Sequence, residues 1–370
     1  MLAGGEIYPR GYQPFPFMYP PSCAAMLALA SIGGEVPFVL GLTLLNSAAW
    51  LAAILLAVYL ATGRFLRQDP LLYLVPTLCV SPFVHDTYLL GQPNLLLLAL
   101  MLGAFACLRL QRQGGAGVLI ALAAAIKAFP ILAIGYLAYR RCWKAIAALV
   151  VGLVILLLVL PMGFRTVERA RDDLATWNRG MVLKYDPYGI AQRPMRSFSF
   201  KNQSLMATAN RLLRSVPADG EVDKRWRVNI ADLDFRTVNA VIVLAGLGLC
   251  TFFMASMPRR GRRTGQTDAI ESAMLLLLIL IFSPLSFNYF YVWLLYPLTV
   301  ALHLVLSAPA RSSERVVLIA WLAATVSLLA LAIPFLRGAQ AYGNVFFADL
   351  LLLIGLGWGM RRLTGLAPTS

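Results

Sequence analysis

PFVLGLTLLNSAAWLAAILLAVYLAT, residues 37–62, contains no charged side chain over 26 consecutive positions. About 20 such residues cross the hydrocarbon core of a bilayer as a helix. Apolar runs of this kind recur as far as residue 360, and the chain of 370 residues is 59% hydrophobic and only 13% charged. Because soluble domains carry about 25% charged residues, the sequence predicts an all-α, polytopic transmembrane helical bundle.

The apolar runs predict about nine spans. Their expected bounds are 37–62, 71–84, 94–110, 144–163, 237–257, 271–287, 291–308, 316–336 and 345–360. Segment 117–139, GVLIALAAAIKAFPILAIGYLAY, has Lys127 and Pro130 in its middle and arginines beyond both ends. A proline inside a helix removes a backbone donor, so we expect a short re-entrant hairpin of two helices here.

Short basic loops between the predicted spans account for much of the net charge of +15, so nucleic acid is not expected as a partner. Cytoplasmic loops of membrane proteins are enriched in Lys and Arg. All these loops lie on one side if segment 117–139 enters and leaves through the cytoplasmic face. The outer side then holds the N-terminal segment 1–36 and the long loop 164–236, within one membrane-embedded domain comprising residues 1–370. We therefore expect functional groups on the outer face of the cytoplasmic (plasma) membrane.

HDTYLLGQPN, residues 85–94, stands at the predicted outer end of two spans. Pro93 suits the first position of a helix and Gln92 the cap before it, with Asn94 following. The N–H groups at such a helix start bind phosphate or carboxylate. Asp86 is the carboxylate of this motif. A plain capped loop with a solvated acid is the alternative interpretation.

Two further motifs join aromatic rings to polar groups. FMYPPS, residues 17–22, contains Tyr19, Pro20 and Pro21, and FSPLSFNYFYVW, residues 282–293, contains Asn288 and Tyr289. Aromatic rings pack well against sugar faces or prenyl chains, so we expect these five residues to line a lipid or acceptor site. An aromatic belt at the membrane interface explains the same rings equally well.

Basic and amide groups gather in RSFSFKNQSL, residues 196–205, which supplies Arg196, Lys201, Asn202 and Gln203. Cations neutralise phosphate, and amides hydrogen-bond sugar hydroxyls; a solvated basic loop stays open as the alternative. Lys127 differs because it lies inside an apolar segment. An intramembrane lysine costs about 2.5–3.5 kcal/mol on insertion scales, so we expect it to face the protein interior and have a partner there.

Nucleotide-driven and hydrolytic chemistry find no support in the sequence. It contains no P-loop, Rossmann fingerprint, HExxH or GxSxG motif. Its five cysteines stand singly without metal-ligand spacing. We therefore expect no cofactor and no metal site.

Taken in order, these stretches resemble glycosyltransferase family 87, whose members are polytopic enzymes of the GT-C superfamily. The resemblance covers roughly residues 4–300. It is carried by GGEIYP, FMYPP, LLGQPNLLLLAL, AGVLIALAAAIKAFPIL with YRRCWKA, SFKNQSL and SPLSF. It implies transfer of a hexose, most familiarly mannose, from a polyprenyl-phosphate sugar to a lipid or glycan acceptor outside the membrane. Lys127, Arg196, Lys201 and the amides listed above would then bind the donor phosphate and sugar.

The sequence departs from the family pattern twice. The family normally has an earlier transmembrane helix and then an outer acid thought to act as base, both upstream of the GGEIYP-like stretch. This sequence begins at Met1, just before that stretch, so we expect both to be missing, and Asp86 is the remaining candidate for the base. Many relatives also carry histidine after the SP-containing turn, where Asn288 and Tyr289 stand here.

Two other functions stay open from the sequence. A transporter or flippase of lipid-linked sugars would use the same polar groups along a pathway, although no internal repeat of the kind common in transporters is visible. A truncated, non-catalytic relative is the other alternative, if the helix and acid are truly missing.

Overall fold

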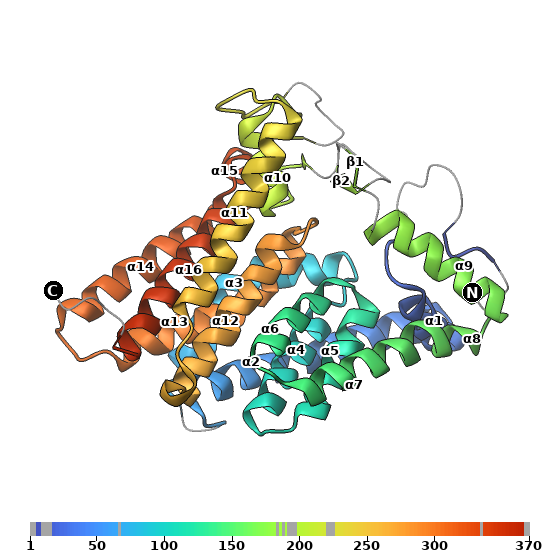
Figure 1. Ribbon diagram of the computed structural model, residues 1–370, viewed down its shortest axis with the longest axis horizontal. Coiled ribbons are helices and arrows are strands. Elements are labelled where there is room, and N and C mark those ends of the chain that lie inside the picture. The colour runs from blue at the N-terminus through green and yellow to red at the C-terminus, as the bar shows by residue number, and fades with distance from the viewer. Residues whose placement is uncertain are drawn as a thin grey trace. The chain divides into compact units, whose positions relative to one another are not determined.

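The computed structural model describes residues 5–8, 17–65, 68–182, 185–186, 189–190, 198–219, 226–333 and 336–365. Within these residues, seven helices are long and apolar enough to cross a membrane (Figure 1). The prediction of an all-α, polytopic membrane protein is therefore confirmed. The two other predicted spans coincide with α3, Leu71–Leu89, and α4, Asn94–Arg109, which are not among the seven. With 16 residues, α4 is shorter than the ~20 that a bilayer requires.

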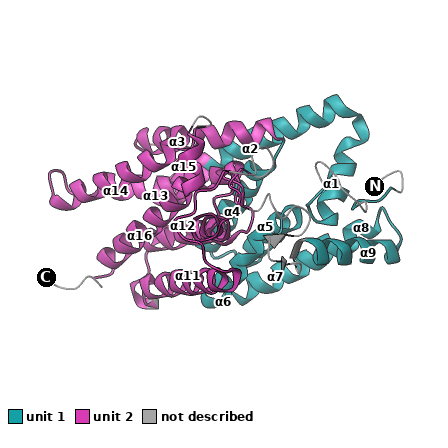
Figure 2. Cartoon of the chain, turned by 90° about the horizontal axis from the view of Figure 1, so that it is seen from above, with its two compact units in different colours: residues 1–53, 91–192 teal, residues 54–90, 193–370 magenta. Residues whose placement is uncertain are grey.

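The chain forms two compact units, each built from separate stretches of sequence. Unit 1 comprises residues 1–53 and 91–192, and unit 2 comprises residues 54–90 and 193–370 (Figure 2). The second helix, α2 (Glu35–Thr62), contributes its first part to unit 1 and its last part to unit 2. Each unit is described separately below.

Unit 1 contains short helices and one long one. Besides α4 and the start of α2, its elements are α1 (Pro21–Ala30), η1 (Ser31–Gly33), α5 (Gln113–Ile126), η2 (Phe129–Leu132), α6 (Ala133–Tyr139), α7 (Trp143–Val154), η3 (Ile155–Val159), α8 (Leu160–Met162), α9 (Val167–Trp177), η4 (Asn178–Val182) and a two-residue antiparallel pair, β1 (Tyr185–Asp186) with β2 (Gly189–Ile190). From α7 to α8 the chain runs as one apolar helix of 20 residues, in which η3 is a π-helical turn.

Unit 2 contains most of the long apolar helices. Besides α3 and the end of α2, its elements are α10 (Leu205–Leu213), α11 (Phe235–Ser256), η6 (Arg260–Arg262), α12 (Gly265–Phe282), η7 (Asn288–Leu294), α13 (Leu295–Ser307), α14 (Ser313–Ala330), α15 (Arg337–Tyr342) and α16 (Asn344–Leu363). The most apolar stretches of α12 and of η7–α13 are 78% and 83% buried, whereas that of α11 is 11% buried. An apolar helix that exposes so much of its surface is stable only in lipid, so α11 lies at the periphery of this unit and α12 and α13 form its centre.

Polar side chains fix where several helices begin. Five helices are each preceded by a residue whose side chain accepts a hydrogen bond from a backbone N–H in the first turn of that helix. These residues are Thr166, Ser204, Asp234, Thr264 and Ser312. Such caps satisfy donors that have no partner inside the helix. The boundaries between polar loops and apolar helices are thus set locally by the sequence.

The segment 117–139 breaks at the residues that the sequence singles out. Helix α5 ends at Ile126, Lys127 adopts an extended backbone with φ −149° and ψ 123°, and Pro130 lies in the 3₁₀ turn η2 before α6. Two short helices therefore replace one span, as expected. That the chain enters and leaves the membrane through one face stays a prediction.

Candidate functional site

Three motifs that are distant in sequence meet around Lys127 in unit 1. The Lys127 ammonium donates to Oε1 of Gln92 at 3.4 Å and to Oδ1 of Asn94 at 3.3 Å. The Tyr19 hydroxyl donates to the same Gln92 oxygen at 2.5 Å, and the ammonium lies 5.4 Å from the centre of the Tyr19 ring. We call Tyr19, Gln92, Asn94 and Lys127 the Lys127 cluster.

A tight turn places the two amides of this cluster. Gly91 has a φ of 58°, in the left-handed region that glycine adopts without strain. Helix α4 then begins at Asn94 with Pro93 as its cap, one residue later than the sequence predicts. Asn94 is fully buried. The start of a helix concentrates positive charge through its oriented N–H groups, so α4 and the Lys127 ammonium create a positive potential in the same place.

The two prolines of FMYPPS position the Tyr19 side of the cluster. Pro20 is the cap of α1 and Pro21 its first residue, where a fixed φ and a missing donor cost a helix nothing. The next side chain, Ser22, is fully buried and donates to the carbonyl of Ala125 at 2.5 Å. Because Ala125 lies two residues before Lys127, this bond ties the start of α1 to the break at the end of α5.

A second group of contacts fixes the N-terminal residues against α9. The hydroxyl of Tyr8 donates to the carbonyl of Tyr19 at 2.7 Å. Arg165 donates to the carbonyl of Gly5 at 2.5 Å and pairs with Asp173 at 3.1 Å. Burial raises the pKa of the Tyr8 hydroxyl, which keeps it a neutral donor. Burial also raises the pKa of the Asp173 carboxyl, against the opposing effect of the Arg165 guanidinium.

In unit 2 the loop before α10 is held by its own amide groups. Asn202 Nδ2 donates to the carbonyl of Pro284 at 2.8 Å, and Asn202 Oδ1 accepts from the backbone N–H of Ser286 at 3.1 Å. Gln203 Nε2 donates to the carbonyls of Phe200 and Gln340, both at 2.6 Å. Both amide side chains are fully buried. Both side chains therefore form hydrogen bonds with backbone groups of the protein. Their contact with a donor sugar stays a prediction.

Arg211 anchors the same loop and was not predicted from the sequence. Its guanidinium is fully buried and donates to the carbonyls of Ser199, Asn202 and Ala341 at 2.9, 2.6 and 2.9 Å. Burial lowers its pKa to about 9, which leaves the group charged at neutral pH. No local pattern distinguishes Arg211 from the other arginines of the long loop, because its carbonyl partners come from two separate segments, the loop before α10 and the residue Ala341 of α15.

Lys201 is the exposed member of this loop. Its ammonium lies 5.9 Å from the centre of the Phe200 ring, and the guanidinium of Arg337 also lies 5.9 Å from that ring. Both cations are exposed. Arg337 is the first residue of α15 and was not predicted as a site residue from the sequence. Arg196 lies outside the described residues.

The remaining predicted residues lie at one end of α3 and in η7. Asn288 and Tyr289 begin η7, and the hydroxyl of Thr87 on α3 donates to the carbonyl of Tyr289 at 3.3 Å. Asp86, one residue before Thr87, has a side chain that is 31% exposed and lies 3.6 Å from Nδ1 of His85. Asp86 therefore belongs to unit 2 and the Lys127 cluster to unit 1.

A buried acid in the last helix was also not predicted from the sequence. Asp349 is completely buried, with an exposed fraction of 0%. Neither of its carboxylate oxygens has a hydrogen-bond partner among the described residues. The signal was present, since Asp349 is the one charged side chain within the predicted span 345–360.

Comparison with known proteins supplies one match. The model of glycosyltransferase family 87 matches residues 17–284. No curated protein and no solved structure match the chain. The matched range includes the Lys127 cluster and the loop of Lys201.

Proposed function

The chain belongs to glycosyltransferase family 87 and is a multi-pass membrane glycosyltransferase, and we propose that it moves a hexose, mannose in particular, from a polyprenyl-phosphate sugar. The acceptor is a lipid or a glycan. The reaction takes place on the outer face of the cytoplasmic membrane. These statements of donor, sugar, acceptor and side are our proposal beyond the family itself.

The observation that carries the proposal is the placement of Lys127. Its ammonium lies at a break between two apolar helices, beside the positive end of α4 and against the Tyr19 ring. A cation inside the membrane costs free energy. We therefore infer that the charge of Lys127 has a function. A phosphate attached to a lipid explains that function, because its apolar part stays in the bilayer while its charge reaches the ammonium.

The proposed reaction breaks the bond between the anomeric carbon and the phosphate oxygen. A hydroxyl oxygen of the acceptor forms the new bond to that carbon and loses its proton to a carboxylate. The polyprenyl phosphate leaves with the bonding electrons and gains negative charge. Preorganised donors stabilise such developing charge best in a site that excludes water, and the Lys127 ammonium with the N–H groups of α4 supplies them.

The other predicted residues have further roles in the proposal. Asp86 is the proposed base, since it is partly exposed on the last turn of α3. Lys201 and Arg337 are exposed cations and are proposed to contact donor or acceptor phosphate, together with Arg196. Tyr19, Pro20, Pro21, Asn288 and Tyr289 are proposed to line the lipid or acceptor side.

The test is a transfer assay in membranes. Membranes that contain the protein and membranes that lack it are incubated with acceptor lipids. The donor is either a radiolabelled polyprenyl-phosphate mannose or a radiolabelled nucleotide-mannose. Synthesis of polyprenyl-phosphate mannose from the nucleotide sugar is inhibited. We expect chain-dependent labelling of a lipid or glycan only with the polyprenyl-phosphate donor. Labelling that depends on the chain but requires the nucleotide sugar would overturn the proposal. Glucose and galactose donors in parallel test the preference for mannose.

A further inference from the structure

The backbone around Tyr19 is held by two side chains from outside the Lys127 cluster. The indole N–H of Trp177 donates to the carbonyl of Met18 at 3.1 Å, and the hydroxyl of Tyr8 donates to the carbonyl of Tyr19 at 2.7 Å. Two prolines follow in the sequence, and each proline ring fixes its own φ. The backbone of Tyr19 is therefore fixed on both sides by groups that do not belong to the cluster.

Neighbouring aromatic rings connect Tyr8 with the Lys127 ammonium. The ring centres of Tyr8 and Phe17 lie 6.2 Å apart, and those of Phe17 and Tyr19 lie 5.5 Å apart. The ammonium lies 5.4 Å from the centre of the Tyr19 ring. Aromatic rings at such distances attract one another, and the face of a ring attracts a cation. A displacement of Tyr8 therefore changes the surroundings of the ammonium through two rings.

Helix α9 presents one face to these N-terminal residues. Ala170, Asp173 and Trp177 are separated by three and four residues, so they lie on the same face of the helix. Ala170 and Trp177 are buried, and α9 contacts α1, which begins two residues after Tyr19. Arg171 and Asp172, by contrast, are exposed. The inner face of α9 therefore supports the segment that contains Tyr19.

An ion pair at the start of α9 holds the stretch that contains Tyr8. The guanidinium Nε of Arg165 lies 3.1 Å from a carboxylate oxygen of Asp173, and another guanidinium nitrogen donates to the carbonyl of Gly5 at 2.5 Å. The side chains of the pair are only 2% and 13% exposed. Charge-assisted hydrogen bonds are stronger than neutral ones, and a low local dielectric strengthens them further. The ion pair therefore fixes the chain three residues before Tyr8.

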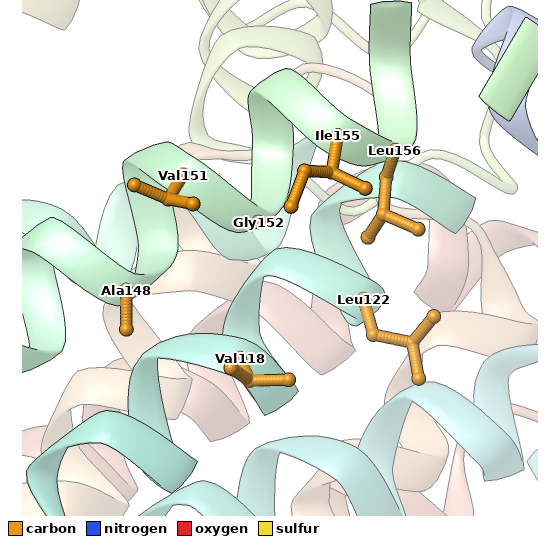
Figure 3. Close-up of a pocket in the computed structure, with 7 residues that line it drawn as sticks. All are labelled: Val118, Leu122, Ala148, Val151, Gly152, Ile155 and Leu156. Atoms are coloured by element: carbon orange, nitrogen blue, oxygen red, sulfur yellow. The ribbon is translucent and has the colours of Figure 1, made fainter. Parts of the chain in front are cut away.

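Close helix packing connects α9 with the helix that ends at Lys127. Helix α9 follows the apolar helix α7–α8 in the sequence, and α7 packs against α5, which ends one residue before Lys127. A Cβ on Gly117 of α5 would lie 2.1 Å from the carbonyl oxygen of Ala145 on α7, and glycine at such a contact lets helices approach closely in membranes. Side chains of both helices line one apolar groove (Figure 3). The elements that support Tyr19 and Lys127 therefore form one packed framework within unit 1.

We propose that Tyr8 and Trp177 are positioning residues for sugar transfer, supported by the ion pair of Arg165 and Asp173. They hold the backbone of Tyr19 so that its ring and hydroxyl keep the Lys127 ammonium aligned with the donor phosphate. This inference rests on the proposed function of the Lys127 cluster. Tyr8 and Trp177 do not contact the substrate, because their effect passes through Tyr19.

A double-mutant cycle in the full-length protein separates positioning from folding. Tyr8→Phe and Trp177→Phe each remove one hydrogen-bond donor and keep an aromatic ring. A misplacement of ~1 Å costs about 100-fold in rate, so we expect each variant to lower kcat/KM for polyprenyl-phosphate mannose by roughly tenfold. In the Lys127→Met background each should lower it by less than about twofold, because the ammonium through which they act is gone. An equal loss in both backgrounds would show a folding defect and overturn the inference, and so would no loss in the wild-type background.

Matched control variants come from the same unit. Tyr136→Phe removes a hydroxyl that accepts a hydrogen bond from Arg140, and its kcat/KM should equal that of the wild type. Asp173→Asn should lower kcat/KM in the wild-type background but not in the Lys127→Met background. Asp172→Asn removes an exposed charge one residue earlier on α9 and should have no effect. An equal loss in Asp172→Asn and Asp173→Asn would overturn the role of the ion pair.

Chemical modification of Lys127 tests the positioning without catalysis. The purified full-length protein in detergent is treated with trace acetic anhydride, and mass spectrometry measures the acetylation rate of each lysine. We expect Tyr8→Phe and Trp177→Phe to raise the rate at Lys127 several-fold, because the Tyr19 ring no longer stays over the ammonium, and to leave the rate at Lys144 unchanged. An unchanged rate at Lys127 would overturn the inference. Raised rates at Lys127, together with no wild-type transfer from any polyprenyl-phosphate donor, would confirm that the ammonium is positioned and contradict the proposed function.

Discussion

Lys127→Met separates the proposed role of the ammonium from any role in folding. Methionine keeps an unbranched side chain of similar length and removes the charge together with the N–H donors of the ammonium. We expect the variant to be made and inserted normally but to transfer sugar much more slowly. The expectation follows from where the ammonium lies: its hydrogen bonds of 3.4 and 3.3 Å are longer than the usual 2.7–3.2 Å, so the fold gains little from them.

The magnitude follows from the two roles of the charge. A hydrogen bond to a charged group contributes about 1.5–3 kcal/mol, and each ~1.4 kcal/mol is a tenfold change. Loss of the donor to the phosphate should therefore lower kcat/KM by about 10 to 150-fold. The melting temperature should not fall, because an ammonium at membrane depth itself costs about 2.5–3.5 kcal/mol on insertion scales.

The assay compares initial transfer rates from polyprenyl-phosphate mannose with thermal unfolding of the purified protein in detergent. Lys144→Met is the matched control, since Lys144 is an exposed lysine in the first turn of α7 and should retain wild-type kinetics. Lys127→Met with at least half of the wild-type kcat/KM would refute the assignment. A variant that loses activity only in proportion to a lower melting temperature would show a structural role instead.

Three predictions concern the folding of unit 2, each measured by unfolding in detergent. Arg211→Met should cost at least roughly 3 kcal/mol, since each buried carbonyl left without its donor costs about 1–3 kcal/mol; a smaller loss would contradict the bonding described. Gly343→Ala should cost more than the ~1–2 kcal/mol of its left-handed backbone, because the new Cβ would lie 2.6 Å from Thr208, whereas Gly338→Ala has open space and should be neutral. Asp234→Ala should lower the melting temperature at pH 7. Hydrogen bonds from Thr237 lower the pKa of Asp234 below its ordinary 3.8, so this stabilisation is present above that value and lost as the pH falls through the lowered pKa; a difference that persists in acid would oppose the assignment.

The membrane class and most helix positions were predictable because bilayer physics acts on local sequence. In lipid every backbone group needs an internal partner, so a long apolar run becomes a helix. The break at Lys127 and Pro130 was predictable for the same reason, since a proline and a charge both disfavour a continuous span. The cap of α4 was misplaced by one residue: Pro93 precedes the helix, and no side chain caps it by a hydrogen bond.

Interactions between distant segments could not be predicted from local pattern. Asn202 and Gln203 look like ligands for a sugar in sequence, yet both side chains are buried and bonded to backbone. Arg211 and Asp349 are buried polar groups whose surroundings depend on helices far along the chain. By contrast, Tyr19, Gln92 and Lys127 were each selected separately, and the fold brings them into contact.

The loop before α10 contains one proposed substrate contact and one structural contact, which burial distinguishes. Lys201 is exposed, whereas Asn202 is fully buried and both ends of its amide bond to backbone. Lys201→Ala should therefore leave the melting temperature unchanged and raise KM for the donor or the acceptor. Asn202→Ala should lower the melting temperature, because it leaves a buried carbonyl and a buried N–H without their partners. Measurement of both quantities for both variants decides the matter: a stable Asn202→Ala protein with a raised KM would show that the amide contacts substrate, against the geometry of the loop.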